Sequence, residues 1–196
     1  MTDVVIAKYE KGMSCVKKWM KLFGIHEKSY QQRAIRWAIL KELGYYEEFP
    51  SVFVPTRQSG LIADEMGLGK TIMMLGTWVG NFKKNTLIVV PSALLNQWDE
   101  LIYKWLGFQP FVFHGNSSKI PIKEIKKHLI VITTYGMIST RKKSNSSRAG
   151  FLPKKWTSVL WEIKWDRIMY DEAHHLRNEK SNKHKGAAKL QSDCQW

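Results

Sequence analysis

Short apolar runs alternate with amphipathic stretches along most of the chain. Five apolar runs predict strands at residues 61–63, 86–90, 111–114, 129–133 and 167–170. Apolar side chains at helical spacing predict helices at residues 29–43, 70–81 and 92–106, and a short basic helix at 119–127. Continuous apolar strands are typical of a parallel sheet that is buried on both faces. The alternation therefore predicts an α/β fold with a mostly parallel central sheet and helices on both faces.

Three stretches fall outside this alternation. Residues 1–28 predict a basic helical lead-in, which we expect to cap the domain rather than to carry a separate function. Residues 45–56 carry aromatic residues and two prolines, and we interpret them as a connector. Residues 141–155 hold six Lys or Arg and no acidic residue, which predicts a basic loop insertion. A solvated loop and a nucleic-acid contact are both open for that insertion.

A glycine-bearing loop joins the first predicted strand to the helix after it. Its residues are Asp64, Glu65, Met66, Gly67, Leu68, Gly69, Lys70 and Thr71. Glycines bring backbone N–H groups close to phosphate oxygens, and the start of the helix adds unpaired N–H groups and the positive end of its dipole. In such a loop Lys70 reaches the β- and γ-phosphates of a nucleotide and Thr71 ligates magnesium. The general phosphate-loop pattern has Gly in place of Asp64, so a plain strand–turn–helix is the alternative for this stretch alone.

An acidic pair, Asp171 and Glu172, follows directly on the last predicted strand. The carboxyl ends of parallel strands form the ligand-binding edge of an open α/β sheet, and the glycine loop follows that edge of its own strand. One carboxylate there can hold magnesium, usually through water, and a second can orient or deprotonate an attacking water. We assign the metal role to Asp171 and the base role to Glu172. His174 and His175 come next, without the H-E-x-x-H spacing of a zinc site.

Charge changes the picture of the partners. The chain has 31 Lys and Arg against 17 Asp and Glu, a net charge of +14. Such a field favours a polyanion, nucleic acid before membrane, although a lysine-rich composition can also serve solubility alone. The two cysteines, Cys15 and Cys194, suggest neither a disulfide framework nor a zinc site, which fits a reducing intracellular compartment. Neither a membrane span of ~18 apolar residues nor a secretory leader is expected.

Other segments complete a series of motifs. Tyr30 and Gln31 precede the glycine loop, residues 89–92 and 132–135 lie between the loop and the acidic pair, and residues 171–174 spell Asp-Glu-Ala-His. In this order the motifs resemble those of the first motor lobe of the Swi/Snf-type (sucrose non-fermenting) chromatin-remodelling ATPases, within helicase superfamily two. The loop with Asp64 is similar to that family's own form of the phosphate loop. The resemblance covers residues 29–196.

The resemblance implies a RecA-like P-loop domain that binds ATP and magnesium. It implies an adenine contact by Gln31, nucleotide chemistry by Lys70, Thr71, Asp171 and Glu172, and a Asp-Glu-Ala-His box completed by Ala173 and His174. It further implies contacts to the DNA backbone at Ser92, Thr133 and Thr134. Backbone contacts do not read sequence, so sequence-independent binding to duplex DNA is expected. The family hydrolyses ATP to move on duplex DNA, which also implies a nuclear location.

The end of the chain lies where the resemblance approaches the family's next motif. Gln195 stands in place of the usual Arg, and the second lobe, with its arginines, does not follow in the 196 residues. We therefore expect a lobe truncated before that motif, which works with a second motor lobe or a protein partner. The alternative is a degenerate lobe that binds DNA or a partner without ATP turnover. A small P-loop kinase or GTPase fits less well, because the guanine motif Asn-Lys-x-Asp is missing.

Overall fold

The computed structural model describes residues 3–45, 58–115, 117, 120–140 and 158–196. The predicted basic insertion at 141–155 lies outside the described residues, as does all but the first residue of the predicted connector at 45–56. The described helices include none with the length and apolarity that a membrane crossing requires.

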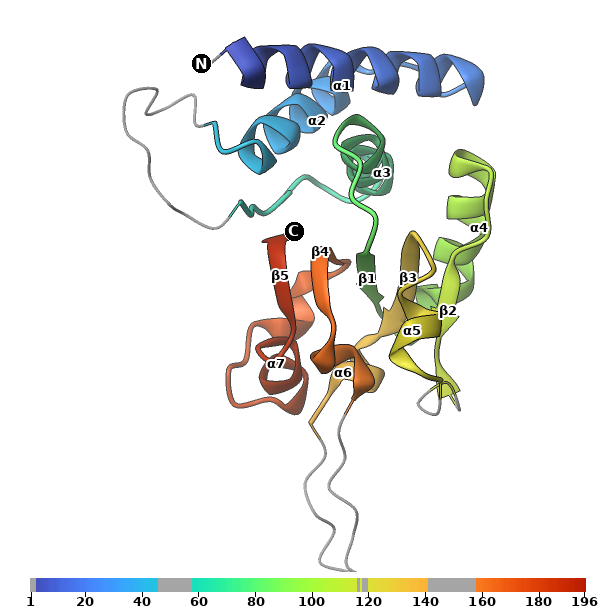
Figure 1. The fold of residues 1–196 in the computed structure, drawn as a ribbon, viewed down its shortest axis with the longest axis vertical. Helices are drawn as coiled ribbons and strands as arrows, with labels where there is room; N and C mark the ends of the chain where they lie inside the picture. The colour runs from blue at the N-terminus through green and yellow to red at the C-terminus, as the bar shows by residue number, and fades with distance from the viewer. Residues whose placement is uncertain (1–2, 46–57, 116, 118–119, 141–157) are drawn as a thin grey trace, which may run out of the picture.

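A five-stranded sheet forms the centre of the molecule (Figure 1). Its strands are β1 (Thr86–Val90), β2 (Phe111–Phe113), β3 (Ile130–Thr134), β4 (Lys164–Tyr170) and β5 (Gln191–Gln195). They lie in the order β2-β3-β1-β4-β5, and every pairing between neighbours is parallel. The predicted α/β fold with a parallel central sheet is confirmed.

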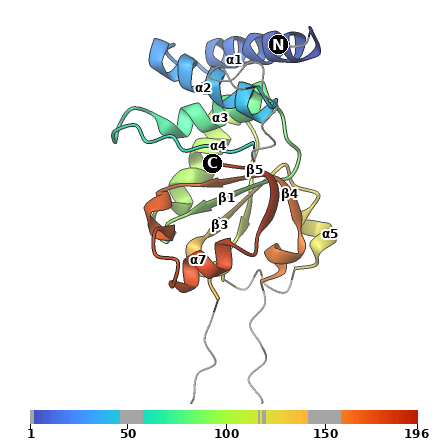
Figure 2. The ribbon, with the colours of Figure 1, turned by 90° about the vertical axis from the view of Figure 1, so that its left-hand side faces the viewer.

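Helices cover both faces of this sheet, because the side chains of β1 alternate between two hydrophobic clusters. Ile88 and Val90 pack with helices α1 (Asp3–Leu22), α2 (Ser29–Glu42), α3 (Lys70–Gly80) and α4 (Leu95–Leu106). Leu87 and Val89 pack on the opposite side with α5 (Ile122–Ile125), α6 (Tyr135–Ile138), α7 (Asn182–Ala187) and the 3-10 helix η3 (Val159–Glu162). Figure 2 shows α1, α2 and α3 stacked beyond one side of the sheet and α7 on the other.

The lead-in at residues 1–28 is mostly helix. Helix α1 buries Val16, Trp19 and Met20 in the cluster that also holds α2 and α3. It approaches α3 closely, because a Cβ added at Gly12 would lie 2.3 Å from the carbonyl oxygen of Gly80. The lysines of α1, among them Lys17 and Lys18, remain exposed.

The strand predicted at residues 61–63 is wrong, since these residues have no strand assignment. The preceding residues do lie beside β5: the Gly60 N–H donates to the carbonyl of Gln195 (3.1 Å), and the Gln195 N–H donates to Ser59 Oγ (3.0 Å). Gln195 is the last residue of β5, and Leu61, the first residue of the predicted strand, is 67% exposed. An apolar run becomes a strand only where a neighbour pairs its backbone groups.

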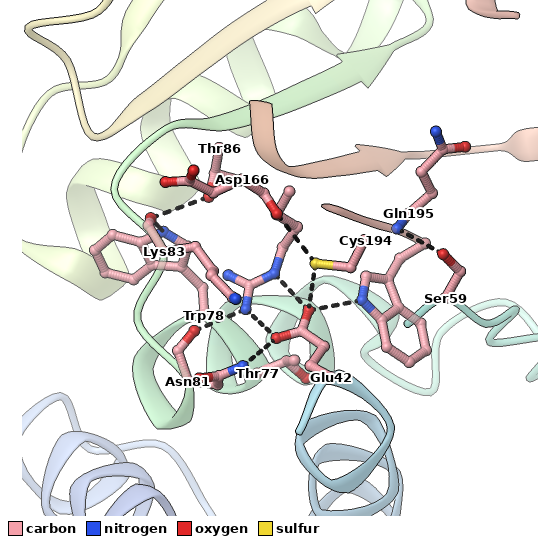
Figure 3. Close-up of polar contacts among 12 residues, drawn as sticks. Glu42, Ser59, Thr77, Trp78, Asn81, Lys83, Thr86, Asp166, Cys194 and Gln195 are labelled. Carbon is pink, nitrogen blue, oxygen red and sulfur yellow. Dashed lines mark hydrogen bonds and ion pairs between the residues drawn. The ribbon is translucent and has the colours of Figure 1, made fainter. Parts of the chain in front are cut away.

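One buried polar cluster joins helices α2 and α3 to the sheet, and we call it the Glu42 cluster (Figure 3). Glu42, the last residue of α2, forms an ion pair with Arg167 of β4, and both side chains are fully buried. The same carboxylate accepts from Asn81 Nδ2 (2.7 Å), Trp196 Nε1 (2.8 Å) and Cys194 Sγ (3.4 Å). Burial beside the Glu42 carboxylate raises the pKa of the Cys194 thiol to about 12.

Candidate functional site

A cleft of about 610 Å³ opens at the carboxyl edge of the sheet. The glycine loop and the start of α3 form one wall, and the turn after β4 forms the other. The predicted site residues that line it are Asp64, Glu65, Met66, Lys70, Thr71, Asp171, Glu172, Ala173 and His174. The fold therefore brings together two motifs that are far apart in the sequence.

The glycine loop has the left-handed backbone that its glycines allow. Gly67 and Gly69 have φ angles of 86° and 81°, and Gly69 directly precedes helix α3. A Cβ at Gly69 would also lie 2.5 Å from Gln31 Nε2, so the Gln31 side chain would have to shift and its hydrogen bond to Leu68 would be disturbed. Glycine at position 69 thus serves both the turn and the close approach of α2.

Lys70 and Thr71 occupy the first turn of α3. Lys70 Nζ donates to the carbonyl oxygens of Asp64 (2.8 Å) and Glu65 (3.1 Å), so the ammonium group connects the start of α3 with the beginning of the glycine loop. Phosphate oxygens would replace these carbonyls as acceptors. Thr71 and Asp171 both line this cleft, Thr71 from the start of α3 and Asp171 from the turn after β4. These hard oxygen donors fit Mg²⁺, which takes one or two protein ligands together with phosphates and water.

Gln31 lies behind the loop rather than in the cleft. Its side chain is 3% exposed, and Nε2 donates to the carbonyl of Leu68 (3.0 Å). Its Oε1 is buried and has no hydrogen-bond partner among the described residues. A buried acceptor of this kind normally has a partner. The exocyclic amine of adenine is a donor of the right chemistry.

Asp171 is held from several sides. Its Oδ2 accepts from Trp98 Nε1 (2.8 Å) and its Oδ1 accepts from the Glu172 backbone N–H (3.1 Å). Its own N–H donates to the carbonyl of Val89 in β1 (2.9 Å), and its carbonyl accepts from the Tyr135 hydroxyl (2.7 Å). Burial and the nearby Asp171 carboxylate raise the pKa of Tyr135, so the hydroxyl remains a donor at neutral pH.

Glu172 stands in a strained turn. It is the one non-glycine residue with positive φ among the described residues, at 52°. For a residue with a side chain this left-handed conformation costs roughly 1–2 kcal/mol. The turn leads into the 3-10 helix η4 (Ala173–Leu176) and keeps the carboxylate in the cleft, where Oε2 lies 3.1 Å from His174 Nδ1.

His175, which follows His174, lies next to a lysine. Its Nδ1 lies 3.2 Å from Lys183 Nζ. Burial and the Lys183 charge lower the pKa of His175, which favours the neutral imidazole.

The three candidate DNA contacts differ in exposure. Ser92 is exposed at the start of the 3-10 helix η1 (Ser92–Leu94), directly before α4. Thr133 and Thr134 are buried in β3, and Thr133 Oγ1 donates to the carbonyl of Phe113 (2.9 Å). Of the three residues, only Ser92 is exposed. A DNA contact at Thr133 or Thr134 stays a prediction, and the burial of both side chains does not favour it.

Sequence reasoning missed two tryptophans in the cleft lining, Trp98 and Trp196. Neither residue is among those that the sequence assigns to the site. The available signal was the indole N–H, since a buried tryptophan usually needs an acceptor. That acceptor is Asp171 for Trp98 and Glu42 for Trp196.

The sequence profile of the SNF2-related domain matches residues 30–196. The chain belongs to the SNF2-related family. An uncharacterised ATP-dependent helicase of Schizosaccharomyces pombe is 32% identical to this SNF2-related chain over 157 residues, which cover 72% of the chain and 15% of the helicase. Transcription termination factor 2 of Drosophila melanogaster is 26% identical over 211 residues, which cover 86% of the chain and 18% of the factor.

Among solved structures, the SWI2/SNF2 ATPase core of Sulfolobus solfataricus in complex with double-stranded DNA is similar, with a TM-score of 0.62 at 24% identity. The match covers 87% of this chain and 31% of that core. It confirms the RecA-like fold of the SNF2-related lobe. The chain spans less than a fifth of the length of the two curated relatives.

Proposed function

We propose that this SNF2-related chain is the ATP-binding motor lobe of a DNA-dependent ATPase that moves on duplex DNA when joined by a second motor lobe. The observation that carries the proposal is that Lys70, Thr71, Asp171 and Glu172 line one cleft. Membership of the family supports this assignment. The names of the relatives, a helicase and a transcription termination factor, support a function on nuclear DNA.

Four residues of the cleft, and Gln31 behind the glycine loop, have tasks in this proposal. Lys70 releases the loop carbonyls and binds the β- and γ-phosphates, and Gln31 Oε1 accepts from the adenine amine. Thr71 and Asp171 hold magnesium, which neutralises charge on the phosphates when it is bound. Glu172 orients the attacking water and takes its proton.

Turnover by the chain alone is a separate matter. Among the described residues that line the cleft there is no arginine. Arginines that stabilise the transferring phosphate are worth about 10³–10⁵ in rate where measured. This favours a second candidate function, a lobe that binds nucleotide and DNA but needs a second lobe or protein partner for hydrolysis.

The test is phosphate release from ATP by the 196-residue chain, with and without duplex DNA, beside nucleotide binding measured by calorimetry. Lys70→Ala should abolish binding of Mg²⁺–ATP, while Glu172→Gln should bind it and release no phosphate. Binding by the wild type without release supports the second candidate. No nucleotide binding by folded wild type contradicts both candidates.

DNA binding is expected to be independent of sequence and sensitive to salt. The net charge of +14 and an exposed hydroxyl at Ser92 favour contacts to phosphates, which carry no sequence information. Two unrelated duplexes of equal length should bind with equal Kd, and the affinity should fall steeply between 50 and 200 mM salt, values at which such proteins lose about 10³–10⁵ in affinity. A strong preference for one duplex at a physiological ionic strength of ~0.15 M would contradict this.

A further inference from the structure

Trp98 is one of three buried residues of helix α4, with Leu95 and Ile102, and it also reaches the cleft. It lies in the first turns of α4, which begins at Leu95, and its side chain is 4% exposed. The indole packs in the hydrophobic cluster shared with α1, α2 and α3 and also lines the cleft. Its Nε1 donates to Asp171 Oδ2 at 2.8 Å. A core residue therefore holds a carboxylate of the site.

This hydrogen bond fixes the rotation of the carboxylate. Each oxygen of Asp171 has one donor, Trp98 for Oδ2 and the Glu172 backbone N–H for Oδ1. The indole is neutral, so it orients the carboxylate and leaves its full negative charge for a cation. A lysine or arginine in the same place would form an ion pair and compete with a metal. Outer-shell donors of this kind orient metal ligands and raise metal affinity.

The position of Trp98 also connects Asp171 with the surface. Helix α4 follows directly on η1, which begins at the exposed Ser92. Ser92 comes just after β1, and Val89 of β1 accepts the Asp171 N–H. A ligand that moves the start of α4 therefore moves the donor on Asp171 Oδ2. The Tyr135 hydroxyl holds the same residue from the other side, at its carbonyl.

We propose that Trp98 is a positioning residue, which fixes the Asp171 carboxylate for magnesium and makes α4 the link between Ser92 and that carboxylate. The inference rests on the proposed function, because it requires that Asp171 receives magnesium together with a bound nucleotide. Trp98 touches neither the nucleotide nor the reacting water in this assignment, and it acts through Asp171.

The test compares Trp98→Phe with Trp78→Phe. Trp78 is a matched control: it is 7% exposed, packs in the same cluster, donates from Nε1 to the Lys83 carbonyl (3.1 Å), and does not line the cleft. The Kd of a non-hydrolysable ATP analogue is measured in Mg²⁺ and in EDTA, and the ratio of the two values gives the gain from magnesium. Trp98→Phe should lower this ratio by about tenfold, the low end of outer-shell effects, and Trp78→Phe should leave it unchanged.

The outcomes distinguish a failure of the proposed function from a failure of the role of Trp98. A wild-type chain that binds the analogue no better in Mg²⁺ than in EDTA refutes the proposed function and the inference with it. A wild-type ratio that survives intact in Trp98→Phe overturns the inference alone. An equal loss in Trp78→Phe also overturns it, because any loosening of the core would then be enough.

A measurement on the wild type keeps the inference testable if Trp98→Phe does not fold. The indole N–H resonances are followed by NMR while Mg²⁺ is added to the complex with the analogue. The Trp98 signal should move and the Trp78 signal should not. Duplex DNA, added next, should move the Trp98 signal again and change the magnesium ratio. If the Trp98 signal does not move when Mg²⁺ is added, the positioning role is overturned. If it does not move when DNA binds, the link through α4 is overturned.

Discussion

The Glu42 cluster and the cleft are two groups of polar residues built on opposite principles. In the Glu42 cluster the carboxylate accepts from Arg167, Asn81, Trp196 and Cys194 and is shielded from water (Figure 3). In the cleft the acidic residues are partly exposed, and Asp171 has only neutral donors on its oxygens. The first group supplies donors to both Glu42 oxygens and holds α2 and α3 on the sheet, although Arg167 Nη1 is buried without a hydrogen-bond partner among the described residues. The second is oriented but leaves its charge for a ligand.

The largest difference should appear when the ion pair loses one partner. Arg167→Met leaves the Glu42 carboxylate buried without its cation, and we expect a loss of about 3–5 kcal/mol in the free energy of unfolding. Urea denaturation followed by circular dichroism measures it. The matched control is Lys164→Met on the same strand, because the pair of Lys164 with Asp193 is exposed and its loss should leave the urea midpoint unchanged. An Arg167→Met midpoint equal to that of the control would mean that the cluster contributes little.

A second substitution sharpens the origin of that loss. Glu42→Gln added to Arg167→Met removes the uncompensated charge but keeps an oxygen for Trp196 and Cys194. Most of the stability lost in Arg167→Met should return, because the cost comes from the buried charge rather than from the missing contacts. The same urea series decides it. A double variant no more stable than Arg167→Met would place the cost in lost packing instead.

Alkaline pH should destabilise the Glu42 cluster by a smaller amount than the loss of Arg167. The pKa of Cys194 is raised from 9.0 to about 12 in the folded chain, so between these values the unfolded chain binds fewer protons. Stability from this group is complete below pH 9 and is lost as pH rises toward 12. At pH 10 the loss should be about 1–2 kcal/mol relative to Cys194→Ser, whose hydroxyl does not ionise. Urea midpoints at pH 7.5 and 10 measure it, and parallel midpoints in both chains would refute it.

In the cleft, a substitution at Glu172 should raise stability rather than lower it. Glu172→Gly relieves the positive φ, and after the larger entropy of unfolded glycine the chain should gain roughly 0.5 kcal/mol. Ala173→Gly, one residue later and without positive φ, should lower stability. Thermal unfolding by calorimetry compares the two variants. Equal losses in both would mean that the turn stores no strain.

The sequence predicted the sheet best where strands are apolar on both faces. Residues 86–90 were expected as a strand and form β1 with those bounds, because both faces of this strand are covered. Strand β5 was not predicted, because Gln191–Gln195 is largely polar. It forms a strand because its backbone pairs with β4. The reverse holds for residues 61–63, which are apolar but have no paired neighbour. Pairing partners come from distant sequence, which a local pattern does not contain.

The site followed the same division. The residue types and their order in the motifs were enough to choose Lys70, Thr71, Asp171 and Glu172, which line one cleft. The role of Trp98 was out of reach, since its acceptor, Asp171, lies in the turn after β4, far away in the sequence. The strain at Glu172 was equally hidden, because glutamate gives no sign of a left-handed turn.

The sequence by itself therefore determined the fold class, the family and the chemistry that the motifs offer. Those properties rest on local spacing and residue type: apolar runs, glycines before Lys70, and two acids after a strand. Only the tertiary structure decided which side chains hold that chemistry in place. The acceptors of Trp98, Tyr135 and Trp196, like the partner of Arg167, come from elements far away in the sequence, and they meet only when the sheet and its helices pack together.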